Sequence, residues 1–245
     1  MYIKNPNLPT GEVSAVAISC EAIKAIDTLH LKGIKTYITE KNPILPEPVC
    51  SHTDLQLFHL FENRILIPNE HLYAGELNKN FNTEQIGEKL GKSYPYDVRL
   101  NCKIIGKNIF LNKKTIAKEI LEYAESNELN IINVNQGYTG CSICVVNESA
   151  VITDDESIFT AAQNFLNDVL LISKGSIRLN GYNYGFIGGC CGKLGPNKLG
   201  LNGRIESHKD KNSIIDFLNK HNTEIIELTD EPLTDIGGII PLMQK

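Results

Sequence analysis

The chain repeats one order of apolar and polar segments. A small or polar patch is followed by a short apolar run, a tight turn, a second apolar run, a segment with helical spacing and a third apolar run. The clearest copy covers residues 140–172, a looser copy covers 101–134, and a third covers 185–228. A period of roughly 40 to 50 residues is typical of arrays of supersecondary units, which bury their apolar faces only when neighbouring units stack or close a ring.

The two ends of the chain supply the parts of one further unit. Residues 21–30 have apolar side chains at helical spacing, and residues 35–39 read as a strand. Residues 233–245 contain a last strand with no helix after it. Because the N-terminal piece lacks its opening strand, we expect the C-terminal strand to complete it. The pattern therefore predicts five units in a closed ring, and a single domain over residues 1–245.

The second unit departs from the pattern. Its hairpin is expected at residues 52–60 and 64–67, but residues 74–97 are polar and contain many Gly and Asn residues. We expect this segment to be an irregular insertion that replaces the helix of the unit and forms a surface loop or lid. The next three helices are expected near 115–126, 156–167 and 210–221. Asp154 or Asp155, and Asp210, are the expected N-caps.

Composition narrows the class of protein. With 245 residues, 42% of them hydrophobic and 22% charged, the chain is expected to fold and bury a substantial core. Its formal net charge of -5 argues against a nucleic-acid surface, which requires clustered Lys and Arg. The N-terminal residues are polar, and no apolar stretch approaches the roughly 20 residues that span a bilayer. We therefore expect a cytoplasmic protein that binds neither nucleic acid nor membrane.

Seven cysteines are present, and in the cytoplasm they are expected to stay reduced. Cys141 and Cys144 have C-x-x-C spacing, and Cys190 and Cys191 form an adjacent pair. Read as a strand, residues 141–146 point the sulfurs of Cys141 and Cys144 in opposite directions, which disfavours a zinc site built from the four thiolates. We expect neither a metal nor a cofactor.

Two short motifs contain residues suited to catalysis. His52 and Asp54 lie two residues apart, and on a strand this spacing places an imidazole and a carboxylate on one face. The alternative is a histidine near solvent with a capping aspartate. Cys141 lies in GYTGCSICVVN, residues 137–147, where glycines let a ligand approach the backbone. The alternative is that Cys141 is a small buried core residue.

Two further glycine-containing motifs supply the remaining candidates. Asp235 lies in TDIGG, residues 234–238, and is either a buried carboxylate that faces a cation or a turn residue. Glycines around Cys190 and Cys191 indicate close approach of the backbone to a ligand or to a neighbouring unit. Either cysteine is an alternative nucleophile, ranked behind Cys141.

A five-unit ring of strands and helices closed by its termini resembles the pentein fold of the enzymes that modify guanidino groups. These include arginine deiminase, dimethylarginine dimethylaminohydrolase and the amidinotransferases. The resemblance implies a pseudo-symmetric α/β propeller with five blades and a central channel. The family uses a nucleophilic Cys, a His followed two residues later by an Asp, and further carboxylates that hold the guanidinium. His52-Thr53-Asp54, Cys141 with its neighbours and the TDIGG segment are similar to these elements.

The order of the motifs departs from the family. Known members place the nucleophilic Cys on the C-terminal strand, where this chain has Pro241 and Leu242. Counted around the ring, however, the H-x-D unit, the Cys unit and the acid unit follow one another at two-unit steps. Arginine deiminase has the same relative order, so this chain resembles a version rotated in sequence.

The resemblance implies two alternative functions. The first is a cysteine-dependent hydrolase or amidinotransferase for a cationic guanidine or amidine, with Cys141 as nucleophile and His52 as acid and base. The remaining site residues would contact the substrate: Asp54, Asp235, Cys190 and Gly237. The second is a noncatalytic pentein that binds a partner or ligand through its ring face, as the ribosome anti-association factor does. Catalysis calls for the Cys141 sulfur, the His52 ring and a carboxylate within roughly 4 to 6 Å, and for a thiol of low pKa.

Overall fold

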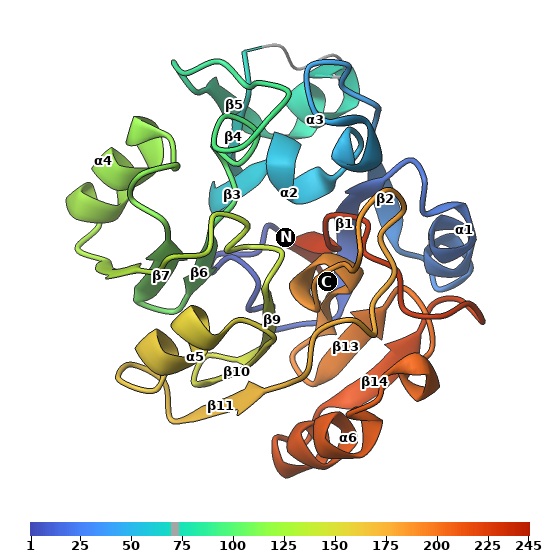
Figure 1. The fold of residues 1–245 in the computed structure, drawn as a ribbon. Coiled ribbons are helices and arrows are strands. Elements are labelled where there is room, and N and C mark those ends of the chain that lie inside the picture. Colours follow the sequence, from blue (N-terminus) through green and yellow to red (C-terminus); the bar gives the residue numbers. More distant parts are fainter. Residues whose placement is uncertain (70–73) are drawn as a thin grey trace.

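Five three-stranded sheets stand in a ring in this computed structural model, which describes residues 1–69 and 74–245 (Figure 1). In each sheet the middle strand pairs antiparallel with one neighbour and parallel with the other. In units 2 to 5 a hairpin makes the antiparallel pair, in unit 1 the two ends of the chain make it, and a crossover through a helix makes the parallel pair in each unit. The predicted five-unit α/β ring is therefore confirmed.

The C-terminal strand closes the ring. Strand β15 (Ile240–Gln244) pairs antiparallel with β1 (Val13–Ser19), with Val13 opposite Gln244 and Ala17 opposite Ile240. The backbone N–H of Ile3 donates to the carbonyl of Leu242 at 3.1 Å, so the N-terminal segment also lies against this strand. Both ends of the chain lie near the centre of the ring in Figure 1. The prediction that the last strand completes the first unit is confirmed.

All five units share one order of elements, namely hairpin, helix and outer strand. Unit 1 contains β15, β1, α1 (Ile23–Leu31) and β2 (Lys35–Thr39). Unit 2 contains β3 (Phe58–Phe61), β4 (Arg64–Ile67), α3 (Ala74–Asn80) and β5 (Asn82–Gln85), and unit 3 contains β6 (Lys103–Ile105), β7 (Asn108–Leu111), α4 (Lys118–Ser126) and β8 (Asn130–Asn133). Unit 4 contains β9 (Ile143–Asn147), β10 (Ala150–Thr153), α5 (Glu156–Ala162) and β11 (Asp168–Leu171), and unit 5 contains β12 (Cys191–Gly195), β13 (Lys198–Leu201), α6 (Lys211–Lys220) and β14 (Glu224–Glu227). Short helical turns outside this scheme are α2 (Thr53–Gln56), η1 (Glu47–Val49), η2 (Gly188–Cys190) and η3 (Ile205–Ser207).

The apolar core lies at the junctions between units. Each pair of neighbouring units shares one buried cluster, as where Ile105 and Phe110 of unit 3 meet Val145 and Val151 of unit 4. The other four junctions are filled in the same way. A single unit therefore has no core of its own, and closure of the ring is what removes the apolar faces from water.

Local sequence signals fix several helix ends. Asp155 is the N-cap of α5, and its carboxylate accepts from the backbone N–H groups of Ser157 and Ile158, as predicted. Asp210 is at the N-cap position of α6, but its carboxylate accepts from the N–H of Ser173 at 2.6 Å. Gly33 follows α1 with a φ of 73°, a conformation that glycine adopts without strain, and so ends that helix.

The prediction that residues 74–97 replace the helix of unit 2 is wrong. The segment contains helix α3 and strand β5, and β5 pairs in parallel with β4 as in every other unit. A helix with the sequence AGELNKN is short, polar and contains weak helix formers, so its composition indicated a loop. Only residues 86–97 are irregular, and they lead from β5 towards β6. The expected single domain stays a prediction.

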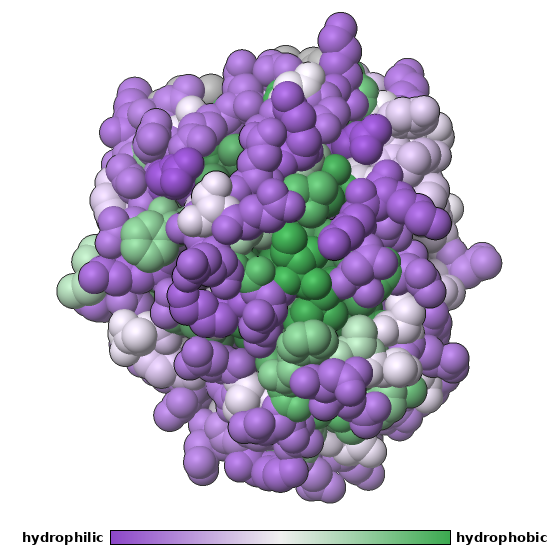
Figure 2. Space-filling model, turned by 90° about the vertical axis from the view of Figure 1, so that its left-hand side faces the viewer, coloured by the Kyte–Doolittle hydropathy of each residue, from purple (hydrophilic) through white to green (hydrophobic). Residues whose placement is uncertain are grey.

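Hydrophilic side chains cover most of the face shown in Figure 2, which has an apolar stripe through its middle. Among the large apolar side chains exposed on unit 4 are Phe165 and Leu171. A few exposed apolar side chains of this kind are normal on the surface of a folded protein. In the described part of the chain, the helices are all too short or too polar to cross a membrane.

Candidate active site

Three of the predicted site residues meet near the centre of the ring: the catalytic candidates Cys141 and His52, and Asp54, which was predicted to contact the substrate. A ring nitrogen of His52, a carboxylate oxygen of Asp54 and the sulfur of Cys141 all lie within 4.8 Å of one another, and all three residues are buried. The fourth, Asp235, places its Oδ1 3.7 Å from Nδ1 of His52. The structure therefore brings together residues that are as much as 183 positions apart in sequence, from His52 to Asp235.

His52 and Asp54 reach the site from the start of helix α2. His52 occupies the N-cap position, and its N–H donates to the carbonyl of Val49 at 3.0 Å. The N–H of Asp54 donates to the carbonyl of Gly237 at 3.1 Å. We predicted a strand here, and that prediction is wrong, because β3 begins only at Phe58. The two side chains converge through the helical turn and not through the alternation of a strand.

Cys141 lies in the turn that precedes β9. We predicted that it lies in the strand itself, and that prediction is wrong. Its thiol donates to Oδ2 of Asp54 at 2.7 Å, and its carbonyl accepts from the N–H of Gly189 at 2.9 Å. A Cβ atom on Gly188 would lie 2.6 Å from the same carbonyl, so only glycine fits there. The glycines of unit 5 thus let its backbone pack directly on the Cys141 turn.

Asn101 is a site residue that the sequence reading missed. Its Oδ1 accepts from the N–H groups of Gly140 and Cys141, at 2.7 and 3.2 Å. Its Nδ2 donates to the Cys141 sulfur at 3.3 Å and to the Asp54 carbonyl at 3.4 Å. Asn101 precedes the first strand of unit 3, as Cys141 precedes that of unit 4. Its position in the repeat was the available signal.

Backbone donors hold the Asp235 carboxylate. Its Oδ2 accepts from the N–H of Phe186 at 2.9 Å, and its Oδ1 accepts from the N–H of Gly237 at 3.0 Å. Gly237 also packs on His52, because a Cβ atom there would lie 2.5 Å from the His52 Cβ. Gly237 therefore positions His52, Asp54 and Asp235 through its backbone.

Gly189 is expected to be required for the position of Asp235. A Cβ atom on Gly189 would lie 2.0 Å from Oδ1 and 2.3 Å from Cγ of Asp235, so Gly189→Ala overpacks a buried carboxylate. We expect the free energy of unfolding to fall by about 1–3 kcal/mol. Gly195→Ala is the matched control, because the nearest atoms there are 3.4 Å away or more. Equal denaturant midpoints for the two variants would contradict this packing.

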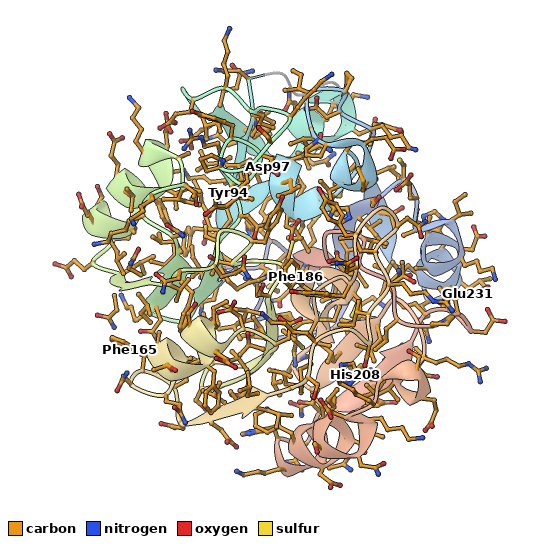
Figure 3. The ribbon with its side chains drawn as sticks, in the orientation of Figure 1. Tyr94, Asp97, Phe165, Phe186, His208 and Glu231 are labelled. Carbon is orange, nitrogen blue, oxygen red and sulfur yellow. The ribbon has the colours of Figure 1, made fainter. Side chains whose placement is uncertain are left out.

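The side chains open into a cavity of about 220 Å³. His52, Cys141 and Asp235 line its inner end, while Asp54 lies behind Cys141 and is not part of the lining. The outer part is lined by apolar, aromatic and amide side chains: Val49, Leu179, Tyr138, Tyr182, Tyr184, Phe186 and Asn183. Phe186 lies near the centre of the ring in Figure 3. A larger cavity of about 520 Å³ shares His52, Leu179 and Asp235 with this one.

Burial and neighbouring charges set the protonation of the nucleophile. Burial raises the pKa of Cys141 well above its usual value, and the charges of Asp54 and Asp235 raise it further. Burial also raises the pKa of Asp54, against the opposing effect of His52. The low thiol pKa that we expected from sequence is therefore wrong for the resting site. In the resting site Cys141 is a thiol that donates to Oδ2 of Asp54.

The other predicted candidates lie outside the cavity. Cys190 is fully buried, and its thiol donates to the carbonyl of Ile187 at 3.3 Å, so the structure does not bring it to the cavity surface. Cys144 and Cys191 lie together in the core between units 4 and 5. Leu242, at the position where the family has its cysteine, is buried in β15 against units 1 and 2.

The side chains of His52, Asp54 and Cys141 are also of the types that bind zinc. The distance of 2.7 Å between the Cys141 sulfur and Asp54 Oδ2 is that of a hydrogen bond. Two such ligands on one tetrahedral zinc ion would lie about 3.5 Å apart, given Zn–S and Zn–O bonds of about 2.3 and 2.0 Å. The arrangement fits a shared proton better than a metal ion.

Sequence comparison assigns the chain to a family. The model of a family of unknown function (DUF6873) matches residues 17–240. The chain belongs to this family. A search of curated proteins found no match to this DUF6873 sequence. The family assignment by itself leaves the chemistry of the site open.

Solved structures show which fold the DUF6873 chain has. An amidinotransferase of the saxitoxin biosynthetic pathway from Microseira wollei matches with a TM-score of 0.60 at 9% identity, covering 99% of this chain and 98% of that chain. Inosamine-phosphate amidinotransferase from Streptomyces griseus matches with a TM-score of 0.59 at 9% identity, covering 100% and 98%. The dimethylarginine dimethylaminohydrolase from Pseudomonas aeruginosa in complex with citrulline gives 0.58 at 8%, covering 95% and 100%. At such identities the likeness establishes the fold, and it confirms the predicted pentein ring.

Proposed function

We propose that this protein is a cysteine-dependent enzyme that cleaves a carbon–nitrogen bond of a guanidine or amidine through a covalent intermediate on Cys141. The observation that carries the proposal is the charge of the inner cavity. Two buried carboxylates, Asp54 and Asp235, lie beside a thiol and an imidazole, and in the described part of the chain neither forms an ion pair with Lys or Arg. Buried carboxylates are stabilised by a cation. A planar guanidinium or amidinium supplies that cation together with an electrophilic carbon.

The resting hydrogen bonds leave a place for such a cation. Asp54 uses Oδ2 to accept from Cys141, while its Oδ1 is buried and has no hydrogen-bond partner among the described residues. An unsatisfied buried oxygen of this kind is costly and calls for an occupant. A guanidinium at the inner end would donate to Asp235, and its positive charge would lie close to Asp54 behind Cys141.

The cation also explains how a thiol of raised pKa becomes a nucleophile. Negative charges on Asp54 and Asp235 contribute to that raised pKa, so a positive charge between them lowers it. The thiol proton then passes to His52, the Cys141 sulfur forms a bond to the central carbon, and the electron pair of a C–N bond moves to nitrogen. His52 donates a proton to the leaving nitrogen, assisted by Asp235 at 3.7 Å. Water in a hydrolase, or an amine in a transferase, then replaces the sulfur, and His52 accepts its proton.

Other penteins are consistent with this proposal. The similar structures include two amidinotransferases and a dimethylarginine dimethylaminohydrolase, all named for chemistry at guanidino groups. Those likenesses concern the fold, so function here rests on the site. A noncatalytic role through the ring face stays the alternative, and it requires neither the Cys141–Asp54 contact nor a cation site.

Asp54→Asn is expected to weaken binding of an amidinium. Asparagine keeps an oxygen that accepts from Cys141 but removes the negative charge, so the affinity for benzamidine should fall at least about tenfold. Isothermal titration calorimetry of the purified protein measures this directly. Asp154→Asn is the matched control, because Asp154 is also buried with an unpartnered Oδ1 among the described residues but, unlike Asp54, accepts no hydrogen bond from Cys141. Equal loss in both variants, or none in either, would contradict the proposed cation site.

A further inference from the structure

The outer part of the cavity has a different chemistry from its inner end. Four aromatic residues, Tyr138, Tyr182, Tyr184 and Phe186, contribute to its lining. Val49 and Leu179 add aliphatic surface, and Asn183 adds an amide. The part of a substrate that extends from the reactive carbon therefore lies against aromatic faces and edges.

Three of these rings form an ordered wall. Tyr138 and Phe186 stack with centroids 6.1 Å apart, and Tyr184 packs edge-on against Phe186 at 5.9 Å. The hydroxyl of Tyr138 donates to Oδ2 of Asp97 at 2.5 Å, which fixes the outer side of the wall. The backbone N–H of Phe186 donates to Asp235, which fixes the inner side. The wall is thus preorganised and joined to the reactive end.

Three aspartates lie close to the wall. Among the described residues, the cavity lining contains neither Lys nor Arg. Asp235 lies at the inner end, Asp54 lies behind Cys141, and Asp97 lies behind Tyr138. A carboxylate on the substrate would find neither Lys nor Arg in this lining and would face the like charge of Asp235. Burial of an unpaired anion beside like charges is strongly unfavourable.

We propose that the substrate is a guanidine or amidine whose remaining part is apolar or aromatic and has no carboxylate. This inference rests on the proposed function and narrows its substrate class. The cavity of about 220 Å³ has room for one ring or a short alkyl chain beyond the cationic head. Amino-acid guanidines are excluded by their carboxylate.

A matched pair of ligands tests the inference. Benzylguanidine and 4-(guanidinomethyl)benzoate share the head and ring and differ only by a carboxylate. Calorimetry on the Cys141→Ser protein, which cannot form the covalent adduct, gives their affinities together with that of guanidinium alone. We expect benzylguanidine to bind at least about tenfold more tightly than the benzoate. Equal affinities, or tighter binding of the benzoate, would overturn the inference while guanidinium binding still supports the proposed function. Failure of all three ligands to bind would overturn both.

Variants of the wall give a second readout. Phe186→Leu removes the stacked ring but keeps the backbone N–H that holds Asp235, so it should weaken the binding of benzylguanidine several-fold and that of guanidinium less. Phe186→Arg introduces a cation and should reverse the preference within the matched pair. Phe165→Leu, an exposed phenylalanine outside the cavity, is the control. An unchanged preference in Phe186→Arg would show that the wall does not contact the substrate tail.

Discussion

Cys141→Ser is expected to abolish turnover of guanidines and amidines while leaving the fold intact. Serine keeps a donor for Oδ2 of Asp54 and an acceptor for Nδ2 of Asn101, so both resting hydrogen bonds are preserved. A serine hydroxyl has a much higher pKa than a thiol, so the positive charge of a bound substrate is not enough to deprotonate the hydroxyl. Loss of a nucleophile typically costs a thousandfold or more, so release of ammonia or amine should fall by at least about that factor.

The control for this variant is another cysteine. Cys20→Ser changes a partly exposed thiol that lies outside the catalytic cavity, and its turnover should stay within about twofold of the parent protein. Circular dichroism and thermal unfolding of both variants establish that they are folded. Residual activity in Cys141→Ser near that of Cys20→Ser would remove Cys141 from the mechanism. The buried Cys190 would then be the next candidate.

The ring fold could be predicted from the sequence because the signals for its elements are local. Apolar alternation, turns and helical spacing recur with each unit, and the missing opening strand of unit 1 pointed to the strand at the far end of the chain. Short elements carried less information. Helix α2 spans only Thr53–Gln56, too few residues to show a helical period, so a strand was expected there.

Only part of the site could be predicted from the sequence, for a different reason. His52, Asp54, Cys141 and Asp235 were found because each belongs to a recognisable motif near the start of a unit's first strand. Asn101 has no motif, and its role depends on hydrogen bonds to residues 40 and 47 positions away. The raised pKa of the Cys141 thiol depends on burial and on two aspartates from other units, which a sequence pattern does not report.

We also expect Cys141 to react faster with cationic reagents than with neutral ones at pH 7. Its pKa is raised by burial and by Asp54 and Asp235, so a neutral alkylating reagent should react slowly at pH 7 and faster as the pH rises above 9. A reagent with an amidinium group brings the positive charge that stabilises the thiolate. It should therefore react at neutral pH, and Asp54→Asn should remove much of this advantage.

Cys20 in the same protein is an internal standard for this effect. It is partly exposed, and neighbouring Glu21 and Glu40 raise its pKa in addition to burial. Simple attraction of a cation to acidic surroundings would act on both thiols. Of these two thiols in the described structure, that of Cys141 has a buried pair of aspartates and the buried His52 beside it.

The most direct test compares 2-chloroacetamidine with 2-chloroacetamide at pH 7, with peptide mass spectrometry following the rate at each cysteine. The account predicts that the amidine-to-amide rate ratio at Cys141 exceeds the ratio at Cys20 by about a hundredfold or more, because the bound amidinium lowers the pKa of the Cys141 thiol. Equal ratios at the two cysteines would contradict the claim that Cys141 is a nucleophile activated by a bound amidinium.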